Sequence, residues 1–157
     1  MKVVLLVIGK TEEKYLLEGI SIYEKRLKHY LPFELLVIPA LKNNKNNTVE
    51  KQKEMEGNLF LASLTQKDHL ILLDEKGKEV TSPGFANYLQ QNMNNGIKRL
   101  IFVVGGPYGF SSELIKRSNG MISLSKLTFS HQMVRLFFVE QLYRAMTILK
   151  NEPYHHQ

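Results

Sequence analysis

The segment LSKLTFSH, residues 124–131, alternates apolar and polar side chains between an expected strand and the last expected helix. Apolar side chains in such a loop can wall an adenine ring, while backbone N–H and C=O groups read the edge of the base. Thr128 or Ser130 could also cap the helix that follows, a role compatible with ligand binding. The residues of this loop therefore predict an adenine-sized pocket and a helix cap.

A second candidate binding loop is Gly105-Gly106-Pro107-Tyr108-Gly109, which directly follows an apolar strand. Its glycines permit positive φ angles and let a ligand approach the backbone closely. The loop lacks the spacing of the dinucleotide fingerprint G-x-G-x-x-G, and the phosphate loop G-x-x-x-x-G-K-[ST] is absent from the chain, so NTP hydrolysis is set aside. A tight turn explains an isolated GGPxG more readily than a ligand site does. The functional alternative is contact with an uncharged part of a ligand, such as adenosine.

The last expected helix, residues 131–150, carries few polar side chains. Glu140 and Arg144 are spaced i,i+4 in the favourable order, which predicts an ion pair within the helix. Arg135 has no acidic residue at i±3 or i±4, so it is a candidate to face a phosphate or carboxylate, although a dimer contact would explain it equally well. The remaining surface of the helix is so apolar that a homo-oligomeric interface is expected to cover part of it.

Metal and thiol chemistry find little support in the composition. The chain has no cysteine, which excludes disulfides and thiolate metal sites. His155 and His156 are adjacent, but neighbours in sequence rarely bind one ion without further ligands, so no metal is expected. No arrangement of Ser, His and Asp indicates nucleophilic catalysis.

The strands and helices that position these residues are predicted from alternating sequence patterns. These patterns predict an α/β fold with a mostly parallel sheet flanked by helices. Ligands bind such sheets at the carboxyl ends of the strands, where loops 73–77, 105–109 and 124–131 could meet. Thr48 is expected to cap a helix, and Gly77 to form a turn after the third strand. The expected strands are residues 3–8, 33–38, 69–73, 99–104 and 121–124, the expected helices 12–29, 48–64, 82–92, 111–117 and 131–150, and residues 41–47 are expected to form a polar surface loop.

The net charge indicates the kind of partner that the protein binds, and the hydropathy indicates where in the cell it is found. The formal charge of +6 and the pI of about 9.4 favour a polyanionic partner, although a soluble domain with surface lysines explains them as well. The apolar run at residues 3–8 is too short for a signal peptide and has no cleavage site, so it is expected to be a buried strand. No run is long enough to cross a bilayer, and a cytoplasmic protein without membrane contact is expected.

The chain resembles the ribosomal RNA large subunit methyltransferase H family, small members of the knotted SPOUT methyltransferases. The resemblance extends over essentially the whole chain. Its landmarks are Gly9, Tyr23-Glu24-Lys25-Arg26, Glu56-Gly57, Leu73-Asp74, Gly77-Lys78, Gly105 to Gly109, Leu124 to Phe129, His131, Arg135, Glu140 to Ala145 and Pro153-Tyr154-His155.

The resemblance implies one SPOUT methyltransferase domain over residues 1–157, with a C-terminal trefoil knot, in a homodimer whose cofactor pocket adjoins the interface. It implies S-adenosylmethionine as cofactor, and methylation at N3 of a pseudouridine in helix 69 of 23S rRNA on the assembled ribosome. The cofactor-binding residues that it implies are Leu73, Gly105, Leu124, Ser125, Lys126, Leu127, Thr128 and Phe129.

Methyl transfer to N3 also requires that a proton leave this nitrogen. Tyr154 and His155 are the expected catalytic residues, with His155 the natural acceptor near neutral pH and His131 its rival. Arg135 is expected to hold RNA phosphate. The family commonly has Pro where Ser130 stands, and Gln157 replaces a usual basic terminus. The alternative functions are a non-enzymatic ribosome- or RNA-binding protein and a flavodoxin-like protein.

Overall fold

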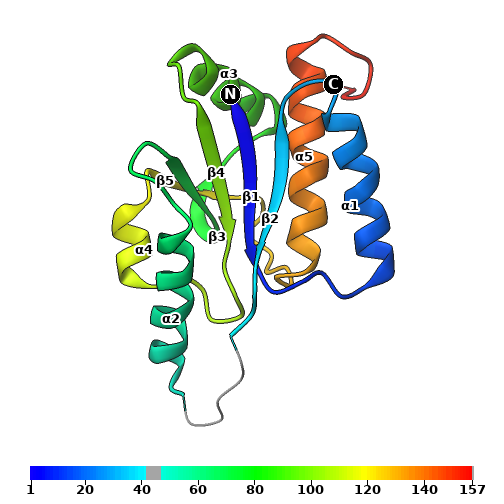
Figure 1. Cartoon of the computed structure of the whole chain (residues 1–157). Helices are drawn as coiled ribbons and strands as arrows, with labels where there is room; N and C mark the ends of the chain where they lie inside the picture. The colour runs from blue at the N-terminus through cyan, green and yellow to red at the C-terminus, as the bar shows by residue number, and fades with distance from the viewer. Residues whose placement is uncertain (42–46, 157) are drawn as a thin grey trace.

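Five parallel strands form one sheet at the centre of the molecule. The computed structural model describes residues 1–41 and 47–156 (Figure 1). The strands follow the spatial order β2-β1-β4-β3-β5, and all neighbouring pairs are parallel. Their bounds are β1 (Lys2–Ile8), β2 (Phe33–Ile38), β3 (His69–Glu79), β4 (Arg99–Val104) and β5 (Gly120–Ser123).

Helices cover both faces of the sheet. On one face lie α1 (Lys14–Leu27), α3 (Ser82–Asn94) and α5 (Met133–Leu149), and on the other lie α2 (Val49–Ala62) and α4 (Ser112–Arg117) (Figure 1). Alternate residues of β1 point to opposite faces, so Val3 and Leu5 join the first core and Val4 and Leu6 the second. This two-faced burial confirms the predicted α/β fold with a parallel sheet.

Most expected elements are found, and two expected caps are confirmed. The strands at 33–38 and 99–104 have the expected bounds, and the other elements shift by a few residues at their ends, apart from β3. The Thr48 side chain accepts a hydrogen bond from Lys51 N at 3.2 Å at the start of α2. Ser130 Oγ accepts one from Met133 N at 3.0 Å, so Ser130 does cap the start of α5.

The third strand does not end where the sequence predicts. β3 continues to Glu79, and both Leu73 and Lys78 pair with Ile122 of β5. The residues between them form a bulge, in which Lys76 N donates to Asp74 Oδ1 at 2.8 Å. The predicted turn at Gly77 is therefore wrong, because the strand is interrupted by a bulge and then continues to Glu79.

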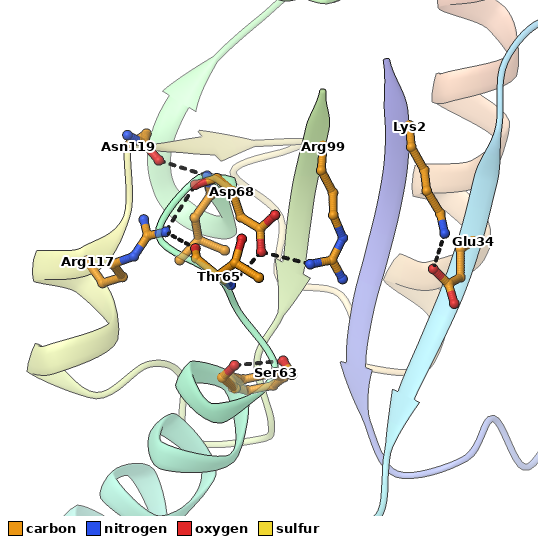
Figure 2. A network of polar contacts seen from close by, with 10 residues as sticks. Lys2, Glu34, Ser63, Thr65, Asp68, Arg99, Arg117 and Asn119 are labelled. Carbon is orange, nitrogen blue, oxygen red and sulfur yellow. Dashed lines mark hydrogen bonds and ion pairs between the residues drawn. The ribbon is translucent and has the colours of Figure 1, made fainter. Parts of the chain in front are cut away.

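A polar network holds the amino-terminal ends of β3 and β4. The carboxylate of Asp68 accepts hydrogen bonds from Arg99 Nη1 and Thr65 N, each at 2.7 Å (Figure 2). Arg117, at the end of α4, donates to the carbonyl oxygens of Thr65 and Asp68. These contacts hold the turn before β3 against α4, and they lie at the end of the sheet opposite to the one where parallel sheets bind ligands.

The predicted polar loop at residues 41–47 lies almost entirely outside the described residues, since these omit 42–46. None of the helices in the described ranges is both long and apolar enough to cross a lipid bilayer.

Candidate active site

A cavity of about 320 Å³ lies at the carboxyl ends of β3, β4 and β5. The loops that follow these ends meet there, as the sequence predicts for a parallel sheet. The residues on its wall are Leu73, Asp74, Glu75, Lys76, Val104, Gly105, Gly106, Pro107, Tyr108, Gly109, Phe110, Leu124, Ser125, Leu127, Thr128, Phe129, His131 and Val134.

The glycine-rich loop is both a tight turn and a wall of this cavity. Gly109 N donates to Gly106 O at 3.1 Å, and Gly109 has a φ of +83°. A Cβ at Gly106 would lie 2.4 Å from Glu56 Oε2 on α2, so no side chain fits there. Because the loop lacks these side chains, it can pack closely on α2 while its backbone stays open to the cavity.

The 124–131 loop is tied to the bulge of β3. Lys126 Nζ donates to the carbonyl oxygens of Glu75 at 2.9 Å and of Gly77 at 3.3 Å. Thr128 Oγ1 donates to the Glu75 carboxylate at 2.7 Å. We call these contacts of Glu75, Gly77, Lys126 and Thr128 the bulge clasp. It joins two walls of the cavity that are about fifty residues apart in sequence.

Comparison with known proteins identifies the family. The family model described as "Predicted SPOUT methyltransferase" matches residues 1–155. This chain belongs to the SPOUT methyltransferase family. It is similar to proteins named ribosomal RNA large subunit methyltransferase H: 59% identical to that of Parabacteroides distasonis and 58% to that of Christiangramia forsetii, each over 157 residues and the full length of both chains. The protein of that name from Cytophaga hutchinsonii is 58% identical over 156 residues, 99% of this chain and all of its own.

The cavity of this SPOUT methyltransferase brings together seven of the eight residues expected to bind the cofactor. The exception is Lys126, which is absent from the wall and whose ammonium group is engaged by backbone carbonyls of the bulge. The sequence predicts that loop 73–77 meets this site, but it did not single out Asp74, Glu75 or Lys76 as binding residues. Their position directly after a buried strand was the available signal.

Arg135 lies inside the SPOUT domain rather than on its surface. The residue is 1% exposed. Its guanidinium donates to the carbonyl oxygens of Ile8, Gly9 and His131 at 2.9–3.0 Å, and to Thr11 Oγ1 at 3.0 Å. Burial lowers the pKa of this guanidinium from its usual value.

The expectation that Arg135 holds RNA phosphate is corrected by this position. Four of its N–H groups already have partners within the chain, and solvent does not reach it. Gln132 strengthens the same junction, because its side-chain amide donates to Lys10 O and accepts from Glu12 N. The start of α5, which forms part of the cavity wall, is thus held to the segment after β1.

Tyr154 and His155 follow the carboxyl end of α5, whereas the cavity lies at its amino-terminal end, where His131 and Val134 are on the wall. Figure 1 shows the C-terminus at the far end of α5. Tyr154 Oη donates to Glu140 Oε1 at 3.0 Å and lies 3.3 Å from Tyr23 Oη. Arg144 places its guanidinium 4.8 Å from the centre of the Tyr154 ring, and its Nη1 lies 3.4 Å from His155 Nδ1. The structure therefore does not bring the expected catalytic pair and the expected cofactor loop together within one chain.

The electrostatics of this C-terminal cluster keep Tyr154 protonated. Burial, together with hydrogen bonds to Tyr23 and Glu140, raises the pKa of the Tyr154 phenol well above its usual value. The ion pair between Glu140 and Arg144, predicted from their spacing, is confirmed at 2.5 Å, and its hydrogen bond raises the pKa of Arg144. At neutral pH, Tyr154 can thus donate a hydrogen bond but cannot accept a proton.

Helices α1 and α5 expose several large apolar side chains. Phe137 is 42% exposed although its ring stacks on Phe129, with ring centres 4.7 Å apart. Tyr15 and Ile22 of α1 are more exposed still.

Over residues 1–41 and 47–156, no three His, Asp or Glu side chains lie close enough to bind one metal ion.

Proposed function

We propose that this chain is an S-adenosylmethionine-dependent 23S rRNA methyltransferase of the cytoplasm. Its target is N3 of pseudouridine 1915, in helix 69 of the assembled ribosome. The observation that carries the proposal is the cavity that the 124–131 loop builds with the glycine-rich loop and the bulge of β3. The names of relatives that are 58–59% identical over their full length support ribosomal RNA of the large subunit as the substrate.

The cavity fits S-adenosylmethionine in size and in chemistry. Its volume of about 320 Å³ lies within the range of small-molecule sites, roughly 300–1,000 Å³. Apolar side chains and open backbone suit an adenosine, and the carboxylates of Asp74 and Glu75 outnumber the single ammonium of Lys76 on the wall. Such a wall disfavours phosphate and tolerates a cationic ligand. When bound, S-adenosylmethionine supplies a methyl group on a positively charged sulfur.

The residues that would hold this cofactor are those of the cavity wall. Their roles are to enclose the base with apolar side chains, to offer backbone hydrogen bonds, and to hold the reacting atom in line with its acceptor. They are Leu73, Gly105, Leu124, Ser125, Leu127, Thr128 and Phe129.

We also propose that the C-terminal segment forms the trefoil knot of the family. β5 lies at the edge of the sheet beside β3, whereas α5 packs into the core shared with α1. Residues 124–132 therefore cross the carboxyl ends of the intervening strands before α5 begins. Pulling the two ends of the chain in an optical trap should give an extended length shorter than that of the free chain, because a tightened knot retains residues. A full-length extension would contradict the knot.

A homodimer explains why the catalytic pair lies far from the cavity of its own chain. α5 has 17 residues, which at 1.5 Å per residue separate its two ends by about 25 Å. Tyr154 and His155 could act on a methyl group only in the cavity of a second chain. The exposed apolar residues Tyr15, Ile22 and Phe137 provide a face on α1 and α5 for this association.

In this arrangement, Tyr154 and His155 have different roles. Tyr154 stays protonated and holds the C-terminal segment in place through its hydrogen bond to Glu140, while an imidazole nitrogen of His155 accepts the proton that leaves N3. His155 Nε2 is buried and, among the described residues, has no hydrogen-bond partner. His131 is the alternative acceptor, because it lies on the cavity wall itself.

The decisive experiment is transfer of a labelled methyl group to purified ribosomes from a strain that lacks this gene. We expect the label in 23S rRNA at one pseudouridine of helix 69. Binding of S-adenosylhomocysteine without any transfer would overturn the substrate but not the cofactor. Binding of ribosomes with no heat upon addition of S-adenosylmethionine would instead identify a non-enzymatic ribosome-binding protein.

A further inference from the structure

A buried carboxylate lies directly behind the glycine-rich loop. Glu56 is on α2 and is 6% exposed. Its Oε2 is so close to Gly106 that a Cβ on this glycine would lie 2.4 Å away. Gly106 lies on the cavity wall, whereas Glu56 does not. Gly106 therefore lies between the Glu56 carboxylate and the cavity.

The negative charge of this carboxylate is poorly compensated. Its Oε1 accepts one hydrogen bond, from Gln52 Nε2 at 3.1 Å. Among the described residues, Oε2 has no hydrogen-bond partner, and none of the ion pairs involves Glu56. Burying an unpaired carboxylate is unfavourable, and a positive charge nearby would relieve this cost.

We propose that Glu56 is a specificity-determining residue that makes the cavity prefer a cationic methyl donor to its neutral product. This inference rests on the proposed function, because it requires that the cavity bind S-adenosylmethionine. A charge acts across a glycine of the wall without touching the ligand, since Coulomb attraction between buried groups extends over several ångströms. No side chain at Gly106 holds the two apart.

The chemistry of the reaction makes this preference useful. In methyl transfer the bond between sulfur and the methyl carbon breaks, its electron pair stays on sulfur, and the methyl carbon bonds to N3 of the uracil ring. The N3 proton passes to the acceptor on the protein. The sulfonium thereby becomes a neutral thioether, so Glu56 would no longer attract the ligand. The carboxylate would thus favour capture of the methyl donor and release of the product.

The test is the affinity of the Glu56→Gln variant for three ligands, measured by titration calorimetry. S-adenosylmethionine and sinefungin carry a positive charge at or near the sulfur position, and S-adenosylhomocysteine does not. We expect the affinity for both cationic ligands to fall by about three- to tenfold, and the affinity for S-adenosylhomocysteine to change by less than twofold. Glu54→Gln removes the same charge from an exposed position on the same helix and should leave all three affinities unchanged.

A second variant tests the same charge without altering Glu56. Gln52→Lys places an ammonium beside Oε1 and should lower the preference for the cationic ligands in the same way. An equal loss for all three ligands, or no change in their ratio in either variant, would overturn the inference and leave Glu56 a purely structural residue. Failure of the wild-type protein to bind any of the three would instead overturn the proposed cofactor, and the inference with it.

Discussion

At the scale of single residues, the ammonium group of Lys126 joins two walls of the cavity without lining it. Lys126→Met keeps most of the side-chain volume but removes both hydrogen bonds to the bulge. We expect S-adenosylhomocysteine to bind about three- to tenfold more weakly, because the loop is then less well ordered before binding. Calorimetric titration measures the affinity.

Lys98→Met serves as the matched control for the Lys126 variant. Lys98 is an exposed lysine at the opposite end of the sheet, just before β4, so its loss changes the net charge equally. We expect its affinity for S-adenosylhomocysteine to equal that of the wild type. Equal affinities in both variants would mean that the bulge clasp does not order the loop.

Arg135 is a residue whose loss should affect folding. Arg135→Ala leaves three backbone carbonyl oxygens and Thr11 without their donor, so we expect the free energy of unfolding to fall by about 2–4 kcal/mol. Thr11→Val removes one of these contacts and should cost about 1 kcal/mol. Urea denaturation measures both values. An Arg135→Ala protein with wild-type stability but weaker ribosome binding would restore the role in RNA contact.

The partners of Arg135 and Lys126 could not be predicted from the sequence, for a physical reason. Arg135 and Lys126 are bound mainly by backbone carbonyl oxygens, which every residue has and which leave no mark in side-chain spacing. The ion pair of Glu140 and Arg144 was predictable because both partners lie on one turn of one helix. Glu56 gave no signal on its own, since only the fold brings α2 against Gly106.

At the scale of elements, the bulge of β3 shapes the cavity and depends on Gly77. A Cβ on this glycine would lie 2.6 Å from the carbonyl carbon of Ile122 and 2.8 Å from its nitrogen, both of which are backbone atoms. We expect Gly77→Ala to push β5 away and to lower the free energy of unfolding by about 1–3 kcal/mol. It should also weaken binding of S-adenosylhomocysteine.

Gly120→Ala, in β5 itself, is the control for this substitution. Its Cβ would meet only the Ile71 side chain, at an ordinary 3.4 Å, so stability should change by less than about 1 kcal/mol. Chemical denaturation compares the two variants. If both alanine variants are equally stable, the close approach of β5 to Gly77 does not constrain the fold.

The elements were predictable where local pattern decides them. Runs of buried apolar residues marked the strands, and Thr48 marked the start of α2 because its side chain caps the helix locally. The continuation of β3 beyond Asp74 was not predictable. Residues 74–79 are charged apart from Gly77, and they are a strand only because β5, more than forty residues later, pairs with Lys78 and Glu79.

At the scale of the whole molecule, the apolar face of α1 and α5 predicts that association and activity are linked. Phe137→Glu places a charge at the exposed stacked ring, where burial in an interface would be unfavourable. We expect sedimentation equilibrium to show a monomer, with methyl transfer lost and S-adenosylhomocysteine binding retained. A dimer with full activity would exclude this face as the interface.

The last prediction separates a site shared between two chains from one contained in each. Ser125→Trp should block the cavity, which loss of S-adenosylhomocysteine binding would verify, and His155→Ala removes the proposed proton acceptor. Each protein alone should be inactive. In a mixed dimer, however, the intact cavity of the His155→Ala chain meets the intact His155 of the Ser125→Trp chain. Random pairing of co-expressed chains should thus restore about a quarter of wild-type methyl transfer. If both act within one chain, no mixture recovers activity, because neither chain has both groups. If His155→Ala alone is active, His131 becomes the acceptor, since it already lies on the cavity wall.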